Sequence, residues 1–113
     1  MKIYHNPRCS KSRKTLMLIQ KNEKNHEIIE YLRSPISNRE LLSLLEMLKI
    51  KPIELVRKGE QIWKEKFKGK NLSDDDLVQA MVEYPKLIER PIVVEDRKAI
   101  IGRPPENVLQ FFD

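Results

Sequence analysis

The residue best suited to chemistry in this 113-residue chain is Cys9, its only cysteine. It follows Asn6-Pro7-Arg8, where we expect a loop to end and a helix to begin. The first turn of a helix offers N–H groups without internal partners and a partial positive charge, and both favour a thiolate. Arg8, Lys11 and Arg13 add positive charge, so we expect the pKa of Cys9 to lie below the ~8.5 of a free thiol. The alternative is a buried, inert core cysteine.

The spacing after Cys9 separates three kinds of thiol chemistry. A dithiol oxidoreductase needs a second cysteine three positions on, where this chain has Ser12. A cysteine phosphatase loop places an arginine six positions on, where this chain has Thr15, and Arg13 comes too early. The sequence therefore predicts a monothiol that takes its second electron-donating thiol from another molecule.

The bulk composition favours a small anionic substrate over a nucleic acid. The formal charge is +5, from 22 basic and 17 acidic residues that are mixed along the chain. The densest basic stretch, Lys64 to Lys70, is interleaved only by Trp63 and Phe67, and is interpreted as a solvated face. We expect no nucleic-acid partner.

The length and the apolar pattern predict one domain over residues 1–113. The beginning, MKIYHNPRCS, has no apolar stretch typical of a signal peptide. No segment approaches the length of a membrane span. A single cysteine suits a reducing compartment, so we expect a cytoplasmic protein without a membrane partner.

The first third of the chain is typical of a β-α-β unit. The predicted elements are a strand from Lys2 to His5, a helix from Cys9 or Ser10 to about Lys21, and a strand over Glu27–Tyr31. Leu16 and Ile19 should face inward from the helix. Two parallel strands with a right-handed crossover are the normal form of such a unit.

Two capping patterns mark helices in the middle of the chain. Ser37-Asn38-Arg39-Glu40 precedes leucines at helical spacing, and Ser73-Asp74-Asp75-Asp76 precedes Leu77, Val78 and Met81. The region from Pro52 to Asn71 is expected to hold loop and short helix.

The last part is typical of a β-hairpin followed by a helix. Strands are predicted over Pro91–Glu95 and Lys98–Ile101, and a helix after Gly102 should bury Val108, Leu109 and Phe112. The whole order predicts an α/β protein of the thioredoxin-like class. Its mixed four-stranded sheet is flanked by helices, with a helical insertion between the β-α-β and β-β-α parts.

The motif from His5 to Arg13, HNPRCSKSR, resembles the active-site motif of the glutaredoxin-dependent arsenate reductases (ArsC family). The similarity continues through Leu55-Val56-Arg57-Lys58, Arg90-Pro91-Ile92-Val93-Val94 and Gly102-Arg103-Pro104. The resemblance implies that Arg57, Arg90 and Arg103 bind the substrate and that the Arg90–Pro91 bond is cis. Guanidinium groups suit a tetrahedral oxyanion because they bind its oxygens bidentately.

His5 and Ser12 are candidates for supporting residues, which hydrogen-bond the thiolate or orient the loop. Each could equally be structural, since a serine in the first turn of a helix often bonds backbone. The two histidines, His5 and His26, with one thiol give no convincing metal-ligand spacing, so no metal is expected.

The resemblance implies reduction of arsenate or a related oxyanion to detoxify arsenic, through a cysteine–arsenate adduct on Cys9. Glutathione would be the co-substrate, glutaredoxin the protein partner, and no cofactor would stay bound. Two alternatives remain open. One is a non-catalytic transcription regulator that binds RNA polymerase, which Ser12 disfavours because it removes the paired cysteine. The other is a glutathione-dependent thiol reductase with another substrate.

Overall fold

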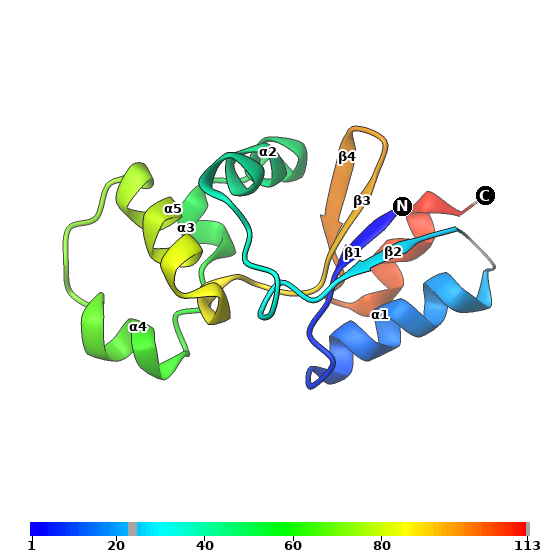
Figure 1. Cartoon of the computed structure of the whole chain (residues 1–113), viewed down its shortest axis with the longest axis horizontal. Coiled ribbons are helices and arrows are strands. Elements are labelled where there is room, and N and C mark those ends of the chain that lie inside the picture. The colour runs from blue at the N-terminus through cyan, green and yellow to red at the C-terminus, as the bar shows by residue number, and fades with distance from the viewer. Residues whose placement is uncertain (23–24, 113) are drawn as a thin grey trace. The chain divides into compact units, whose positions relative to one another are not determined.

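A computed structural model describes residues 1–22 and 25–112, and Asp113, the last residue of the predicted domain, lies outside them. The chain forms two compact units (Figure 1). Unit 1 comprises Met1–Ser34 and Arg90–Asp113, and unit 2 comprises Pro35–Glu89. Nothing in this division tests the prediction of a single domain over residues 1–113, which stays a prediction.

Unit 1 is built on a four-stranded mixed sheet. Its elements are β1 (Lys2–Tyr4), α1 (Ser10–Lys21), β2 (Glu27–Ile29), β3 (Ile92–Glu95), β4 (Lys98–Ile101) and the 3₁₀ helix η2 (Pro105–Phe111). The strand order is β2-β1-β3-β4, with β1 parallel to β2 and antiparallel to β3, and β3 antiparallel to β4. The α/β, thioredoxin-like fold predicted from the sequence is confirmed.

The core of unit 1 lies where α1 and η2 pack on one face of the sheet (Figure 1). Ile3 pairs with Val93 across β1 and β3, so both side chains point to the same face. Together with Ile19 of α1 and Val108 of η2 they are fully buried. This cluster holds α1 and η2 against the sheet.

Three sequence expectations in unit 1 need correction. The second strand ends at Ile29, and Tyr31 lies buried in the turn that follows. The last helix is 3₁₀, with three residues per turn, so Pro105, Val108 and Phe111 share its inward face. Leu109 is therefore turned outward and is 41% exposed, and the prediction that it is buried is wrong.

Unit 2 is the helical insertion. It contains α2 (Asn38–Leu48), α3 (Pro52–Leu55), α4 (Gln61–Lys66), α5 (Asp74–Glu83) and the 3₁₀ helix η1 (Pro85–Leu87). The predicted caps are present: Ser37 Oγ accepts from the Glu40 N–H at 3.1 Å, and Ser73 and Asp76 form a reciprocal capping box. The buried leucines of α2 and the apolar face of α5 form its core.

The segment around α4 packs into unit 2 through aromatic side chains. The Trp63 and Phe67 rings stack with centroids 5.6 Å apart, and Tyr84 meets Phe67 edge-on at 5.9 Å. The lysines at positions 64, 66, 68 and 70 are all exposed. The basic stretch is thus the solvated side of a segment whose aromatic side chains face inward.

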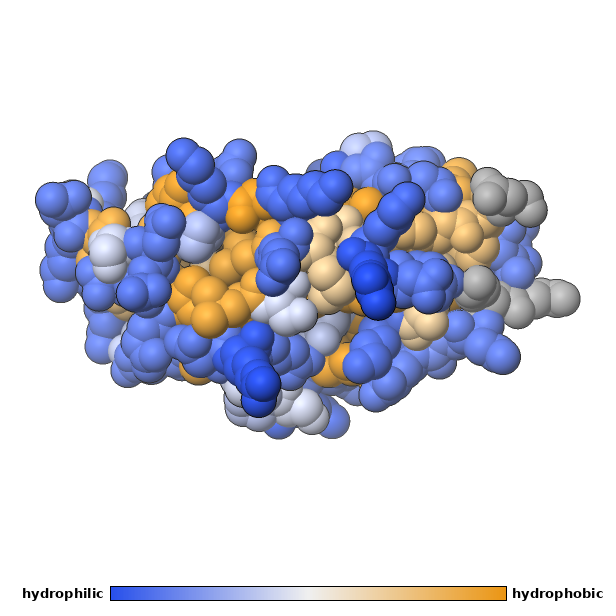
Figure 2. All heavy atoms as spheres, turned by 90° about the horizontal axis from the view of Figure 1, so that it is seen from above, coloured by the Kyte–Doolittle hydropathy of each residue, from blue (hydrophilic) through white to orange (hydrophobic). Residues whose placement is uncertain are grey.

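Hydrophilic side chains cover most of the face seen in Figure 2, with apolar side chains in patches between them. Within the described part of the chain, no helix has the length and apolar character needed to cross a membrane.

Candidate active site

A tight loop carries the chain from β1 to Cys9. The His5 N–H donates to the Ile29 carbonyl at 2.8 Å, which ties the end of β1 to β2. The Asn6 side-chain oxygen then accepts from the Arg8 N–H at 3.0 Å, and the Asn6 carbonyl accepts from the Cys9 N–H at 3.0 Å. Cys9 has extended backbone angles and α1 begins at the next residue. Cys9, the predicted nucleophile, therefore occupies the N-cap position of the helix, where the sequence predicts the helix to start.

The surroundings of the sulfur favour the thiolate. Burial is the largest single influence and raises the pKa of Cys9, whose side chain is only slightly exposed. The N–H groups of Ser12 and Lys11 and the side chain of Arg90 act in the opposite direction and together prevail, so the pKa of Cys9 is lowered. The thiolate is thus held by the helix N-terminus and by a guanidinium.

Arg103 is aimed at the same sulfur. Its Nη2 donates to Cys9 Sγ at 3.6 Å, while its Nε donates to the Arg90 carbonyl at 2.8 Å. The second bond anchors the guanidinium and fixes the direction in which its terminal nitrogens point. Sequence reasoning missed this anchor, because no pattern in the sequence signals a bond from Arg103 to a carbonyl 13 residues away.

Two proline bonds shape the loops that carry these arginines. The Arg90–Pro91 bond is cis, as the resemblance implies, and Arg103–Pro104 is cis as well. The Gly102 N–H donates to the Pro91 carbonyl at 2.9 Å. The two loops are thereby joined directly beside Cys9.

Gly102 has a structural role beside Cys9 that the sequence analysis does not assign, although it lies in the Gly102-Arg103-Pro104 segment that resembles the family. A Cβ at this position would lie 2.5 Å from Thr15 Oγ1 and 2.7 Å from Pro91 Cγ. Thr15 is fully buried in α1, and its hydroxyl donates to the Lys11 carbonyl at 2.8 Å. Only a glycine lets the Arg103 loop approach α1 this closely. The glycine directly before Arg103-Pro104 is the sequence signal that could have indicated this close approach.

His5 and Ser12 form a buried pair behind the loop. His5 Nδ1 lies 2.6 Å from Ser12 Oγ, which also accepts from the Asn6 N–H at 3.0 Å. Burial chiefly, and Arg13 in addition, lower the pKa of His5, although Glu30 opposes them. The neutral His5 imidazole and the Ser12 hydroxyl therefore stabilise the loop. The Ser12 backbone N–H, in contrast, hydrogen-bonds the Cys9 sulfur.

Arg57 belongs to unit 2, whereas Cys9, Arg90 and Arg103 belong to unit 1. Its guanidinium is paired with Glu89 and, at 3.3 Å, with Glu60. Its N–H donates to the Leu87 carbonyl at 2.7 Å, beside the bridge between Val56 and Ile88. The structure thus brings two of the three predicted arginines to the sulfur, and substrate binding by Arg57 stays a prediction.

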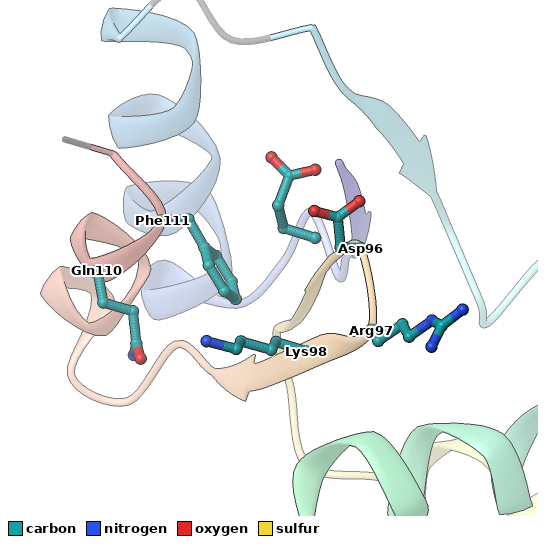
Figure 3. A pocket seen from close by; sticks show the side chains of 6 residues that line it. Asp96, Arg97, Lys98, Gln110 and Phe111 are labelled. Atoms are coloured by element: carbon teal, nitrogen blue, oxygen red, sulfur yellow. The ribbon is translucent and has the colours of Figure 1, made fainter.

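Unit 1 is hollowed beside the active-site loop and beside the β3–β4 hairpin. One hollow, of about 220 Å³, adjoins the active-site loop and is lined by His5, Asn6, Pro7, Arg8, Glu30, Leu32 and Arg33. The other, of about 500 Å³, lies between the β3–β4 turn and Phe111 (Figure 3). The side chains around the larger hollow carry both signs of charge and include no nucleophile, so we place the candidate site at Cys9.

In residues 1–22 and 25–112, no three His, Cys, Asp or Glu side chains are grouped so that they could hold a metal ion. Cys9 is a free thiol.

Comparison with known proteins places this geometry in a family. A protein from Escherichia coli K12, YfgD, is 50% identical over 112 residues, which are 97% of this chain and 94% of that protein. The arsenate reductase of Haemophilus influenzae is 44% identical over 96% of this chain and 95% of its own. The solved structure of the arsenate reductase from Vibrio cholerae superposes with a TM-score of 0.91 at 46% identity, covering 97% of each chain. The sequence model of the ArsC family matches residues 4–111, and the chain belongs to the ArsC family.

Proposed function

We propose that this protein is a glutathione- and glutaredoxin-dependent arsenate reductase in which the Cys9 thiolate attacks arsenate. The observation that carries the proposal is the Arg103 guanidinium, with Nη2 3.6 Å from Cys9 Sγ and Nε anchored on the Arg90 carbonyl. Arg90 also bonds the same sulfur. A nucleophile and two cations are therefore gathered within reach of one small anion.

The charges of this site match the demands of the reaction. Arsenate is a tetrahedral anion at neutral pH, and a thiolate approaching it meets electrostatic repulsion. Guanidinium groups offset that repulsion and stabilise the negative charge that builds on the oxyanion during attack. Arg90 and Arg103 supply this charge from the two loops that Gly102 joins.

The proposed cycle balances in atoms and electrons. The Cys9 thiolate displaces hydroxide or water from arsenic and forms a cysteine–arsenate adduct. Glutathione displaces a second hydroxide from the arsenic. A glutaredoxin thiolate then attacks the glutathione sulfur, and the sulfur–arsenic bond breaks with its electron pair left on arsenic, which becomes arsenic(III). Water finally displaces Cys9 from the arsenic(III) and releases arsenite. In sum, one arsenate and two thiols give arsenite, one disulfide and one water, and Cys9 returns as a thiolate. Since Cys9 has no resolving cysteine in the chain, both reducing thiols come from outside.

Arg57 is the third substrate-binding arginine in this proposal. Its pairing with Glu60 and Glu89 neutralises much of its charge within unit 2. If Arg57 binds the substrate, the oxyanion must therefore compete with the Glu60 and Glu89 carboxylates for the Arg57 guanidinium. Arg57→Ala should raise the KM for arsenate if this competition occurs, and should leave it unchanged if the ion pairs serve the fold alone.

The test of the proposal is NADPH oxidation coupled through glutathione, glutaredoxin and glutathione reductase, run with arsenate, phosphate and sulfate. Arsenate alone should support turnover, and phosphate should act only as a competitive ligand because thiols do not reduce phosphorus(V). Arg90→Ala and Arg103→Ala should each lower kcat/KM by about 10²-fold or more. The absence of arsenate-dependent turnover with several glutaredoxins would refute the proposal.

A further inference from the structure

The net positive charge of this protein comes from one of its two units. Unit 2 has 10 basic and 10 acidic residues, whereas unit 1 has 12 basic and 7 acidic residues. The first 22 residues contain six basic residues and no acidic residue. The charge excess thus belongs to the part of the chain that holds Cys9 and α1.

An exposed apolar side chain stands in the middle of this basic segment. Met17 of α1 is 63% exposed, more than any other large hydrophobic side chain in the described residues. Its neighbours on the helix surface, three and four residues away, are Arg13, Lys14, Gln20 and Lys21, and all four are exposed. An apolar centre with a charged, solvated rim is the usual anatomy of a protein–protein contact, in which Met and Arg are enriched.

We propose that this α1 face, made by Met17 with Arg13, Lys14, Gln20 and Lys21, is the docking surface for an acidic protein that delivers the reducing thiol to Cys9. The inference rests on the proposed function, because it assigns the surface by which the thiol donor reaches that site. Charge complementarity selects the partner, since the rim carries three cations and no anion.

Met17 and Cys9 lie close enough along α1 for one protein partner to cover both. Met17 follows Cys9 by eight residues, which is about 12 Å of helix at 1.5 Å per residue. An ordinary interface covers about 800 Å² on each partner, so a donor seated on Met17 also reaches the start of α1. A nucleic acid or an anionic membrane would use the rim charges without placing a thiol at Cys9.

The test separates docking from arsenate chemistry. Cys9 is first converted to its mixed disulfide with glutathione. A glutaredoxin thiolate then attacks the glutathione sulfur, breaks that disulfide, becomes glutathionylated itself and releases the Cys9 thiolate. Two glutaredoxins are compared, one with an acidic and one with a basic surface around its reactive cysteine, and dithiothreitol serves as an uncharged small thiol. No arsenate is present, so this result is independent of arsenate turnover.

The variants are Lys14→Glu/Lys21→Glu and Met17→Ser, and the matched control is Arg97→Glu/Lys98→Glu, two exposed residues at the β3–β4 turn of the same unit. The charge reversal should lower the rate constant with the acidic glutaredoxin about tenfold, and added salt should lower the wild-type rate towards the same value. Met17→Ser should lower it several-fold, and the control should behave as wild type. All four proteins should react equally with dithiothreitol.

Equal losses in the control, or a wild-type rate in both α1 variants, would overturn the proposal. So would preference for the basic glutaredoxin. Binding of duplex DNA or of phosphatidylserine vesicles that both α1 variants abolish, with unchanged exchange rates, would assign the surface to a different partner and would overturn it as well.

Discussion

At the scale of single residues, the sulfur of Cys9 is held by backbone and guanidinium groups together. The N–H groups of Ser12 and Lys11 reach it from α1, and Arg90 and Arg103 reach it from two loops. The pKa of Cys9 is lowered although burial raises it. The fraction of Cys9 present as thiolate is therefore higher than that of an ordinary thiol at the same pH.

Alkylation tests this directly. The rate with iodoacetamide follows the thiolate fraction, so its midpoint should fall below the ~8.5 of a free thiol. Arg103→Ala removes one donor to the sulfur and should move the midpoint upward. Arg97→Ala, on the exposed β3–β4 turn, is the control and should leave it in place. A midpoint at or above the free-thiol value in the wild type would contradict the account.

His5 makes stability depend on pH. Its pKa is lowered in the folded protein, mainly by burial, so below about pH 6.5 the unfolded chain takes up a proton that the folded chain resists. The free energy of unfolding should therefore decrease as pH falls through that value. His5→Gln should show a smaller decrease than the wild type in urea unfolding at pH 7.5 and 5.5. Identical pH dependences would show that His5 has no such effect.

At the scale of elements, the site depends on how closely the Arg103 loop packs on α1. Gly102 permits this approach, because a Cβ there would lie 2.5 Å from Thr15 Oγ1. Arg103 starts from the next residue, so any shift of the loop moves its guanidinium away from Cys9.

Gly102→Ala should destabilise the protein by about 1–3 kcal/mol, as overpacking does, and should lower activity more than stability alone explains. Gly59→Ala is the matched control, because nothing lies within 4 Å of a Cβ at that position. Its effect should stay within about 1 kcal/mol. Adding Thr15→Ala to Gly102→Ala should cost less than the sum of the single changes, since the two sites share the contact. Strict additivity in chemical denaturation would speak against the contact.

The sequence predicts elements better than it predicts this packing. Caps at Ser37 and Ser73 and the strands of the hairpin depend on local chemistry, and they are confirmed. Leu109 was misplaced because the apolar pattern does not distinguish a 3₁₀ from an α-helix over one or two turns. Cys9 could be proposed as the nucleophile from its own neighbours in the sequence. The bond from Arg103 to the Arg90 carbonyl could not, since it depends on the tertiary contact of two loops.

At the scale of the whole molecule, charge and chemistry coincide in unit 1. That unit contains Cys9, Arg90 and Arg103 and also the whole charge excess of +5, while unit 2 is balanced. The field of a positively charged unit attracts small anions and accelerates their encounter with the site.

The rate of encounter should therefore depend on ionic strength. The kcat/KM for arsenate should fall as potassium chloride is raised from 20 to 500 mM, at fixed glutathione and glutaredoxin concentrations. Lys2→Glu/Lys11→Glu, two exposed positions of unit 1, should lower kcat/KM at low salt and have little effect at high salt. The same exchange in unit 2, Lys64→Glu/Lys68→Glu, provides the comparison. A flat salt profile would show that steering has no part in the reaction.

The most direct test of the account is chromatographic measurement of arsenite formed from arsenate in the presence of glutathione and glutaredoxin. Wild-type protein and Cys9→Ser are compared after matched unfolding curves show that both are folded. The account predicts that the wild type forms arsenite over many turnovers and that Cys9→Ser forms none above the rate without protein. Arsenite formation by Cys9→Ser at the wild-type rate would contradict the central claim that Cys9 attacks the oxyanion.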